Sequence, residues 1–126
     1  MLVDTDVMTD ILRNHPPAIA WLQSIQSKSL GISGFVAMEL IQGCRNRVEQ
    51  QRVLQMIGKH VVYWPSENDC NHAISDFSKF YLSDSLGIID SLIAHTAIGL
   101  GWSLATFNVK HYRVIQSLTT LQPYTR

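Results

Sequence analysis

The chain opens with MLVDTDV (residues 1–7), a short apolar run that ends in a carboxylate. An uninterrupted apolar run of this kind is typical of a buried strand, and Asp4 marks the point where that strand ends. Asp4 and the polar residues after it can cap a helix, and Val7 and Ile11 continue at helical spacing. The first residues therefore predict a buried strand followed directly by a helix, and this strand–helix unit is the pattern that the rest of the chain repeats.

The same alternation continues along the chain. Strands are predicted within residues 30–33, 61–64, 103–107 and 119–124, and helices over 16–25, 33–44, 46–58, 66–82 and 88–100. This pattern predicts an α/β domain with a central, mostly parallel sheet of four or five strands, covered by helices on both faces. Such sheets bind ligands at the carboxyl ends of their strands, which is where we expect Asp4 and Asn108.

Length and composition restrict the possible classes of protein. A chain of 126 residues is enough for a single domain, residues 1–126, and its 46% apolar and 16% charged residues exclude a disordered chain. Ten basic residues balance ten acidic ones. Nucleic acid could therefore be held only by local basic patches and not by overall charge.

The sequence predicts neither export nor membrane insertion. Cys44 and Cys70 are expected to be reduced thiols, and the first residues lack the features of a signal peptide, so a cytoplasmic protein is expected. Residues 91–109 are free of formal charge, but they include several polar side chains and the turn-forming residues 99–102, Gly-Leu-Gly-Trp. This stretch is predicted as helix, turn and strand, and no membrane contact is expected.

Three carboxylates stand where the pattern predicts burial. Asp4 ends a buried strand, and Glu39 is the only formal charge between residues 29 and 44, on a predicted helix with no obvious solvent face. Asp90 shares a helix face with small and apolar residues. Taken singly, Asp4 could be a helix cap and Glu39 could point outward. Asp90 could lie in the first turn of a helix, where the helix dipole stabilises a carboxylate.

Taken together, the three acids predict a metal site. Carboxylates brought into one pocket repel each other, and a divalent cation removes that penalty. Mg²⁺ and Mn²⁺ prefer oxygen ligands, and Mg²⁺ commonly keeps waters and a substrate phosphate in its coordination sphere. An acidic cluster at the end of a parallel sheet therefore indicates phosphate-ester chemistry.

The candidate residues lie in four blocks, of which the first three contain the acids: MLVDTDV (1–7), ISGFVAMELIQG (32–43), IDSLIAHTA (89–97) and LATFNVKHY (104–112). In order and in spacing these blocks resemble the motifs of the PIN-domain nucleases, and within that family the small VapC-type toxins of bacterial toxin–antitoxin pairs. The resemblance covers essentially the whole chain. It departs at Asn108, where many relatives carry a fourth Asp, so the number of metal ions is left open.

The resemblance implies metal-dependent hydrolysis of RNA that leaves a 5′-phosphate and a 3′-hydroxyl and blocks translation. Asp4, Glu39 and Asp90 would hold Mg²⁺ or Mn²⁺, and Thr106 and Asn108 would complete the catalytic set by orienting waters or a ligand carboxylate. Asp6 is a further candidate that could bind a water ligand of the metal, or could simply start a helix. The resemblance also implies a homodimer that is held inactive by a cognate antitoxin protein.

Basic residues are concentrated in two segments. Residues 45–60 hold four basic side chains against one acid, and residues 103–126 hold three against none. Such segments on either side of an acidic pocket would bind the RNA phosphates that flank the scissile one. The residues expected to do so are Arg45, Arg47, Lys110 and Arg113. An ordinary solvated surface is the other interpretation of the same residues.

Three other classes of protein compete with the nuclease. A phosphatase of the haloacid-dehalogenase type also begins with a strand and Asp-x-Asp, with Asp4 as its nucleophile, but it would leave Glu39 and Asp90 without a role. A phospho-receiver domain needs an acceptor Asp after its third strand, and residues 61–65 contain none. A non-catalytic RNA- or protein-binding module stays open because of Asn108. The five histidines are scattered and show no zinc-ligand or catalytic spacing.

Overall fold

The computed structural model describes residues 1–25 and 30–126. Its sheet has the order β3-β2-β1-β4-β5, and every neighbouring pair is parallel. The strands are β1 (Leu2–Val3), β2 (Gly31–Ser33), β3 (Val61–Tyr63), β4 (Leu104–Ala105) and β5 (Thr120–Leu121). The predicted sheet is confirmed, and its ladders within the described residues are wholly parallel.

Seven helices accompany the sheet in the described part of the chain. They are α1 (Thr5–Leu12), α2 (Pro16–Ser24), α3 (Gly34–Gln42), α4 (Arg47–Ile57), α5 (Glu67–Asp84), α6 (Ile88–Leu100) and α7 (Val109–Tyr112). All but α7 were predicted, and α7 was missed because one helical turn is too short to show a periodic pattern. Among the described residues, no helix has the length and apolar character needed to cross a membrane.

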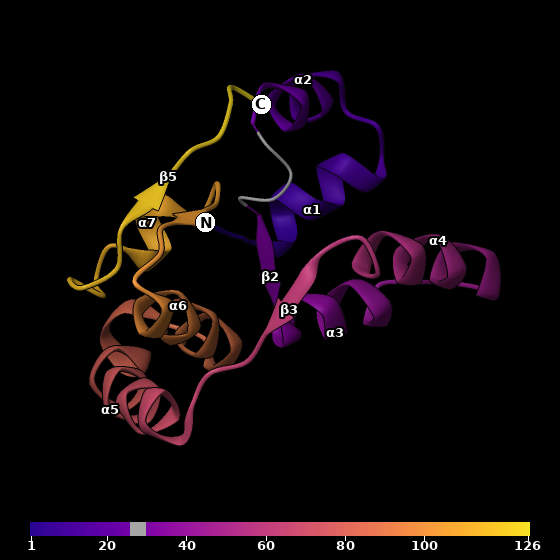
Figure 1. The fold of residues 1–126 in the computed structure, drawn as a ribbon. Helices are drawn as coiled ribbons and strands as arrows, with labels where there is room; N and C mark the ends of the chain where they lie inside the picture. The colour runs from indigo at the N-terminus through magenta and orange to yellow at the C-terminus, as the bar shows by residue number, and fades with distance from the viewer. Residues whose placement is uncertain (26–29) are drawn as a thin grey trace.

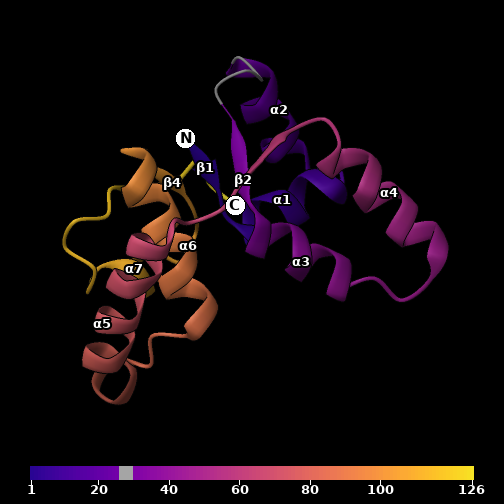
Figure 2. The same ribbon diagram turned by 60° about the horizontal axis from the view of Figure 1, so that its bottom comes forward.

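The helices form two layers around the sheet. In Figure 1 and Figure 2, α1 to α4 lie on one side of the strands, and α5 and α6 lie on the other. Right-handed crossovers require this arrangement, because the chain moves outward from β1 to β2 and β3 and then returns past β1 to reach β4. The strand order therefore reverses between β1 and β4, and ligands bind doubly wound sheets at this switch point.

The three central strands, β1, β2 and β4, are buried on both faces, whereas the edge strands β3 and β5 are partly exposed. Leu2, Val3, Ile32 and Leu104 are fully inaccessible to solvent, as expected for central parallel strands. The predicted helix without a solvent face is wrong in part, because Met38 on α3 is 59% exposed. The sequence pattern missed this exposure because the outward side of α3 is itself apolar.

The C-terminal residues fasten β5 to α1. Arg126 donates from Nε to Oδ2 and from its terminal nitrogen to Oδ1 of Asp10, both at 3.0 Å, and the Tyr124 hydroxyl donates to Asp10 Oδ2 at 2.9 Å. The Arg126 guanidinium also lies 4.8 Å from the centroid of the Phe107 ring. Residues far apart in sequence thus hold the loop after β4 against the start of the chain, and we call this group the C-terminal latch.

The latch should contribute measurably to stability. Burial raises the pKa of Asp10, but the hydrogen bonds from Arg126 and Tyr124 outweigh it, so the pKa lies below its ordinary value. Because Arg126 is half exposed, we expect Arg126→Gln to lower the free energy of unfolding by about 1–2 kcal/mol at neutral pH. A carboxyl with a lowered pKa loses its contribution as pH falls through the folded value, so the difference should vanish in acid.

Urea unfolding of Arg126→Gln and wild type across acidic and neutral pH measures this difference. Arg113→Gln is the matched control, because it removes the same charge from an exposed position at the end of α7. An equal loss of stability in both variants, or a loss that persists in acid, would contradict the role of the latch.

Candidate functional site

The candidate site begins at the switch point between β1 and β4. Asp4 directly follows β1 and caps α1, with its Oδ1 accepting from the Thr5 backbone N–H at 2.8 Å. Its Oδ2 accepts from the Thr106 hydroxyl at 2.8 Å, and Thr106 directly follows β4. Parallel strands that end at one edge bring together two residues that are 102 positions apart. The helix cap predicted at Asp4 is confirmed, and Asp4 lies at the end of β1.

The Asp4 carboxylate is buried, and it has no cationic partner among residues 1–25 and 30–126. It is 6% exposed, and its hydrogen-bond donors are neutral: one backbone N–H and the hydroxyls of Thr106 and Tyr112. Burial, together with the nearby Asp6 carboxylate, raises its pKa to about 6, although the hydrogen bonds act in the opposite direction. A carboxylate in this state is a group that a bound cation would stabilise.

Tyr112 connects Asp4 to Asp90. Its hydroxyl lies 3.3 Å from Asp90 Oδ1 and also hydrogen-bonds to Asp4, and the residue is only 1% exposed. Burial and the two carboxylates raise the pKa of Tyr112 far above its ordinary value of about 10, so the hydroxyl remains a proton donor. His111 adds a second contact, since its Nε2 lies 2.9 Å from Asp90 Oδ2. The short helix α7 therefore holds Asp90, which lies in the first turn of α6.

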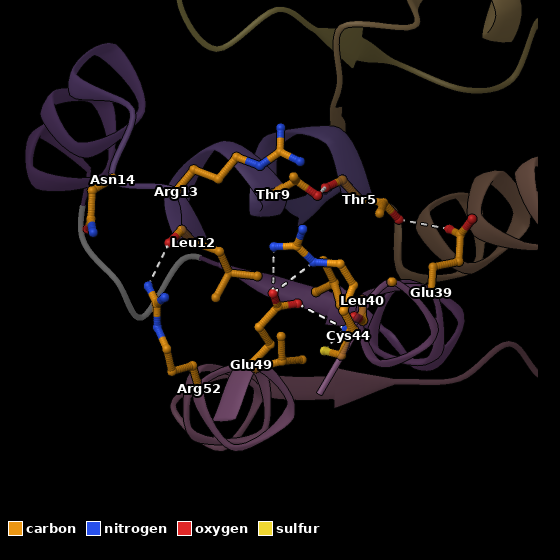
Figure 3. A pocket seen from close by; sticks show the side chains of 13 residues that line it. Thr5, Thr9, Leu12, Arg13, Asn14, Glu39, Leu40, Cys44, Glu49 and Arg52 are labelled. Atoms are coloured by element: carbon orange, nitrogen blue, oxygen red, sulfur yellow. Dashed lines mark hydrogen bonds and ion pairs between the residues drawn. The ribbon is translucent and has the colours of Figure 1, made fainter. Parts of the chain in front are cut away.

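Thr5 connects the start of α1 to Glu39. The Thr5 hydroxyl donates to Glu39 Oε1 at 2.7 Å, and Glu39 lies half-buried on α3. Because Thr5 follows Asp4 directly, this bond brings the α3 carboxylate to the same edge of the sheet as Asp4. Figure 3 shows the Thr5 and Glu39 side chains facing each other across the space between α1 and α3.

These carboxylates do not form a closed cage. Within the described residues, no three His, Cys, Asp or Glu side chains lie close enough together to hold a metal ion as they stand. Mg²⁺ does not require such a cage, because it is usually bound through one or two carboxylates with waters filling the other positions. The oxygen donor set and the uncompensated Asp4 therefore fit Mg²⁺ or Mn²⁺ bound with most of its waters retained.

The remaining predicted site residues lie around this edge. Asp6 accepts from the Val7 N–H at 2.7 Å and from the Phe107 N–H at 3.0 Å, so it both starts α1 and fixes the loop after β4. Burial raises its pKa, although these hydrogen bonds oppose the change. Asn108 is exposed at the start of α7, and its backbone N–H donates to the Thr106 hydroxyl oxygen at 3.0 Å.

The four predicted basic contacts are all exposed, but they differ in surroundings. Arg45 is occupied by Glu49, with hydrogen bonds of 3.0 and 2.8 Å to Glu49 Oε1. Arg47 begins α4. Lys110 and Arg113 lie on and just after α7, directly beside the residues that contact Asp90.

Sequence reasoning missed Thr5, His111 and Tyr112. The scattered histidines were predicted to form no zinc or catalytic motif, but the sequence did not reveal that two of them pair with carboxylates, His111 with Asp90 and His95 with Asp76. A signal was present, because His111 and Tyr112 lie in the same block as Thr106 and Asn108, and Thr5 lies between two acids. Periodicity alone could not show that their side chains face the other acids.

The protein is thus an α/β protein with an acidic site at the switch point of a parallel sheet, to which helices of both layers contribute residues. The profile of the PIN domain family matches residues 1–115. Ribonuclease VapC19 from Mycobacterium tuberculosis is 30% identical over 121 residues, which cover 93% of this chain and 95% of that protein. Ribonuclease VapC10 from the same organism is 32% identical over 120 residues, with coverage of 94% and 90%. The chain therefore belongs to the PIN domain family, and within it to the VapC group.

Solved structures of similar fold agree with this membership. A toxin–antitoxin complex from Klebsiella pneumoniae contains a chain with a TM-score of 0.81 at 21% identity, covering 99% of this chain and 98% of that one. VapBC-1 from nontypeable Haemophilus influenzae gives a TM-score of 0.78 at 24% identity, with coverage of 97% and 96%. The predicted PIN-like fold is confirmed.

The buried Asp4 should make stability fall as pH rises. Its pKa of about 6 lies about 2 units above the ordinary value, so the folded metal-free protein binds a proton more tightly than the unfolded chain. Between pH of about 4 and 7 this group should cost up to about 3 kcal/mol. Asp4→Asn removes the titration, so its stability relative to wild type should increase across that window.

Urea unfolding at several pH values in a chelator measures the change. Comparing differences between pH values cancels any constant cost of the altered hydrogen bonds to Asn. Asp84→Asn, at an exposed carboxylate that ends α5, is the matched control and should differ from wild type by a constant amount. A constant difference for Asp4→Asn as well would show that Asp4 carries no such penalty.

Proposed function

We propose that this protein is a Mg²⁺- or Mn²⁺-dependent endoribonuclease, the toxin of a toxin–antitoxin pair. It hydrolyses RNA phosphodiester bonds, leaves a 5′-phosphate and a 3′-hydroxyl, and so blocks translation. The observation that carries the proposal is the buried, uncompensated Asp4, linked through Tyr112 to Asp90 and through Thr5 to Glu39. Relatives named as ribonucleases that match over nearly the whole chain support it.

In this proposal Asp4, Glu39 and Asp90 hold the metal, directly or through its waters. The bound metal supplies charge stabilisation at the phosphate and lowers the pKa of the attacking water. The chain's own residues orient the acids: Thr106 fixes the Asp4 carboxylate, and Tyr112 keeps Asp4 and Asp90 turned toward each other.

Asn108 and Asp6 take positioning roles in the proposal. Asn108 is exposed beside the Thr106 hydroxyl and offers an amide that can orient a water without adding charge. Asp6 holds the loop that carries Phe107 and Asn108 in place, and any lone pair left to it can bind a water of the metal. Lys110 and Arg113 lie beside the Asp90 contacts, where they would bind RNA phosphates, whereas Arg45 would have to leave Glu49 to do so.

The proposed partners follow from the relatives. Similar solved chains come from toxin–antitoxin complexes, and one of them, VapBC2 from Rickettsia felis, is bound to a DNA fragment from the promoter of the pair. We propose that this chain likewise pairs with a cognate antitoxin, which covers the acidic site, and that it forms a homodimer. The phosphatase alternative is disfavoured because Asp4 is buried and both of its oxygens accept hydrogen bonds, which leaves no exposed nucleophile.

Removing a site acid should abolish cleavage without unfolding the protein. We expect Asp90→Asn and Asp4→Asn each to lower the rate of RNA cleavage by more than about a hundredfold, because loss of a group that only orients a ligand already costs about 10- to 100-fold. Asp84→Asn, which makes the same chemical change at an exposed carboxylate at the C-terminal end of α5, should retain full activity. Thermal melts establish that each variant is folded, and retained cleavage in both site variants would reject Asp4 and Asp90 as the catalytic acids.

The product ends and the metal requirement test the finer claims. RNA from cells that briefly express wild type, compared with cells that express Asp90→Asn, should gain new ends that ligate as 5′-phosphates. In vitro cleavage should stop in a chelator and return with Mg²⁺ or Mn²⁺. New 5′-hydroxyl ends, or cleavage unaffected by the chelator, would replace the metal mechanism with a different one.

Tyr112→Phe isolates the bridge between the acids. The substitution keeps the buried ring and removes only the hydroxyl, so we expect a roughly 10- to 100-fold fall in cleavage rate. Its second readout is the Asp4 carboxyl, whose pKa should rise above about 6 when the Tyr112 hydrogen bond is lost. An NMR titration of Asp4 measures this value, and an unchanged Asp4 pKa would contradict the bridge.

A further inference from the structure

A cleft of about 870 Å³ lies between α1, α3 and α4 (Figure 3). This volume is near the upper end of the range of about 300–1,000 Å³ that is usual for ligand sites. One end of the cleft contains Thr5 and Glu39, the hydrogen-bonded pair of the candidate site. The cleft is therefore continuous with the acidic edge of the sheet, and whatever occupies it can reach that edge.

The charge of the cleft changes along its length. Arg45 and Glu49 neutralise each other in its middle part. Arg52 projects from α4 at the end away from Glu39, and Arg13, which ends α1, points toward Thr9 along the cleft (Figure 3). The cleft thus has a carboxylate at one end and two further guanidinium groups along its length.

Both arginines have donors to spare. The Arg52 terminal nitrogen donates to the Leu12 backbone oxygen at 3.1 Å, which holds the guanidinium across the cleft and uses one of its five N–H groups. The Arg13 side chain makes no hydrogen bond or ion pair with any residue in 1–25 or 30–126. Guanidinium groups bind phosphates through paired N–H donors, so this part of the cleft fits an anionic backbone.

We propose that this cleft binds the single-stranded RNA on one side of the scissile phosphate, with Arg13 and Arg52 contacting its backbone phosphates. The assignment rests on the proposed nuclease function. The acids beside Glu39 need a bound cation before they can accept a phosphate, whereas Arg13 and Arg52 can bind phosphates directly. An RNA strand along the cleft would therefore be held by the two arginines and would present its cleaved phosphate to the acids. Leu12, Leu40 and Val53 line the cleft between them and offer apolar contact to a base or ribose.

A single strand fits this cleft better than a duplex does. Basic grooves with apolar contacts are the usual means of holding single strands, whose bases are unstacked and accessible. An acidic protein segment could in principle satisfy the same arginines, and the experiment below distinguishes it from RNA.

Binding is measured by fluorescence anisotropy with a short single-stranded RNA of mixed sequence, in the Asp90→Asn background so that the RNA stays intact. Arg13→Gln and Arg52→Gln should each weaken binding roughly three- to tenfold. Each should also reduce the slope of log affinity against log salt by about 0.7, the value for one phosphate contact on a single strand. Lys79→Gln on α5, outside the cleft, is the matched control and should change neither quantity.

Kinetics in the otherwise wild-type protein give a second readout. Arg13→Gln and Arg52→Gln should raise KM and largely preserve kcat, because they act on binding and lie away from the acids. Unchanged affinity and salt slope in both variants would overturn the cleft assignment, provided that wild type cleaves RNA and Asp90→Asn does not. If wild type neither binds nor cleaves RNA, the proposed function itself fails.

A synthetic Glu-rich peptide tests the other occupant. Peptide binding that depends on Arg13 and Arg52, with RNA binding unchanged by the same substitutions, would assign the cleft to an acidic protein segment and overturn our proposal. RNA binding that weakens in both variants, and not in Lys79→Gln, supports it.

Discussion

The structure depends on one carboxylate that is buried at the end of the central strand. Asp4 is removed from water, and in the described part of the chain its hydrogen-bond donors are all neutral: the Thr5 N–H, the Thr106 hydroxyl and the Tyr112 hydroxyl. These bonds make burial tolerable but do not compensate it fully, which is why the pKa of Asp4 rises to about 6. The same hydrogen bonds tie β1, β4 and α7 together, so the chemistry of the site and the cohesion of the sheet rest on the same atoms.

The doubly wound topology explains why acids from distant segments meet at Asp4. The strand order reverses between β1 and β4, so helices from both layers begin at this edge of the sheet. Glu39 comes from α3 in one layer and accepts a hydrogen bond from Thr5. Asp90 comes from α6 in the opposite layer and accepts one from Tyr112. Each acid thus accepts a hydrogen bond from a neutral hydroxyl, and Asp90 also contacts His111.

Charge is separated across the surface even though the chain is neutral overall. The acids converge at one edge of the sheet, and cations border that edge on α7 and line the cleft beside α1 and α4. Counting charges along residues 45–60 overstates the basic character of that segment, because Arg45 forms an ion pair with Glu49. Only the folded arrangement shows which arginines keep their donors available.

The sequence by itself determined the strands, the six longer helices and the candidate acids, because apolar periodicity, capping residues and motif spacing are local properties of the chain. It also placed Asp4 and Thr106 at strand ends. Tertiary structure alone decided the contacts that join them: Thr5 to Glu39, His111 to Asp90, and Arg126 to Asp10. These pairs depend on strand order and on side-chain direction at long sequence separation, and no local pattern encodes either.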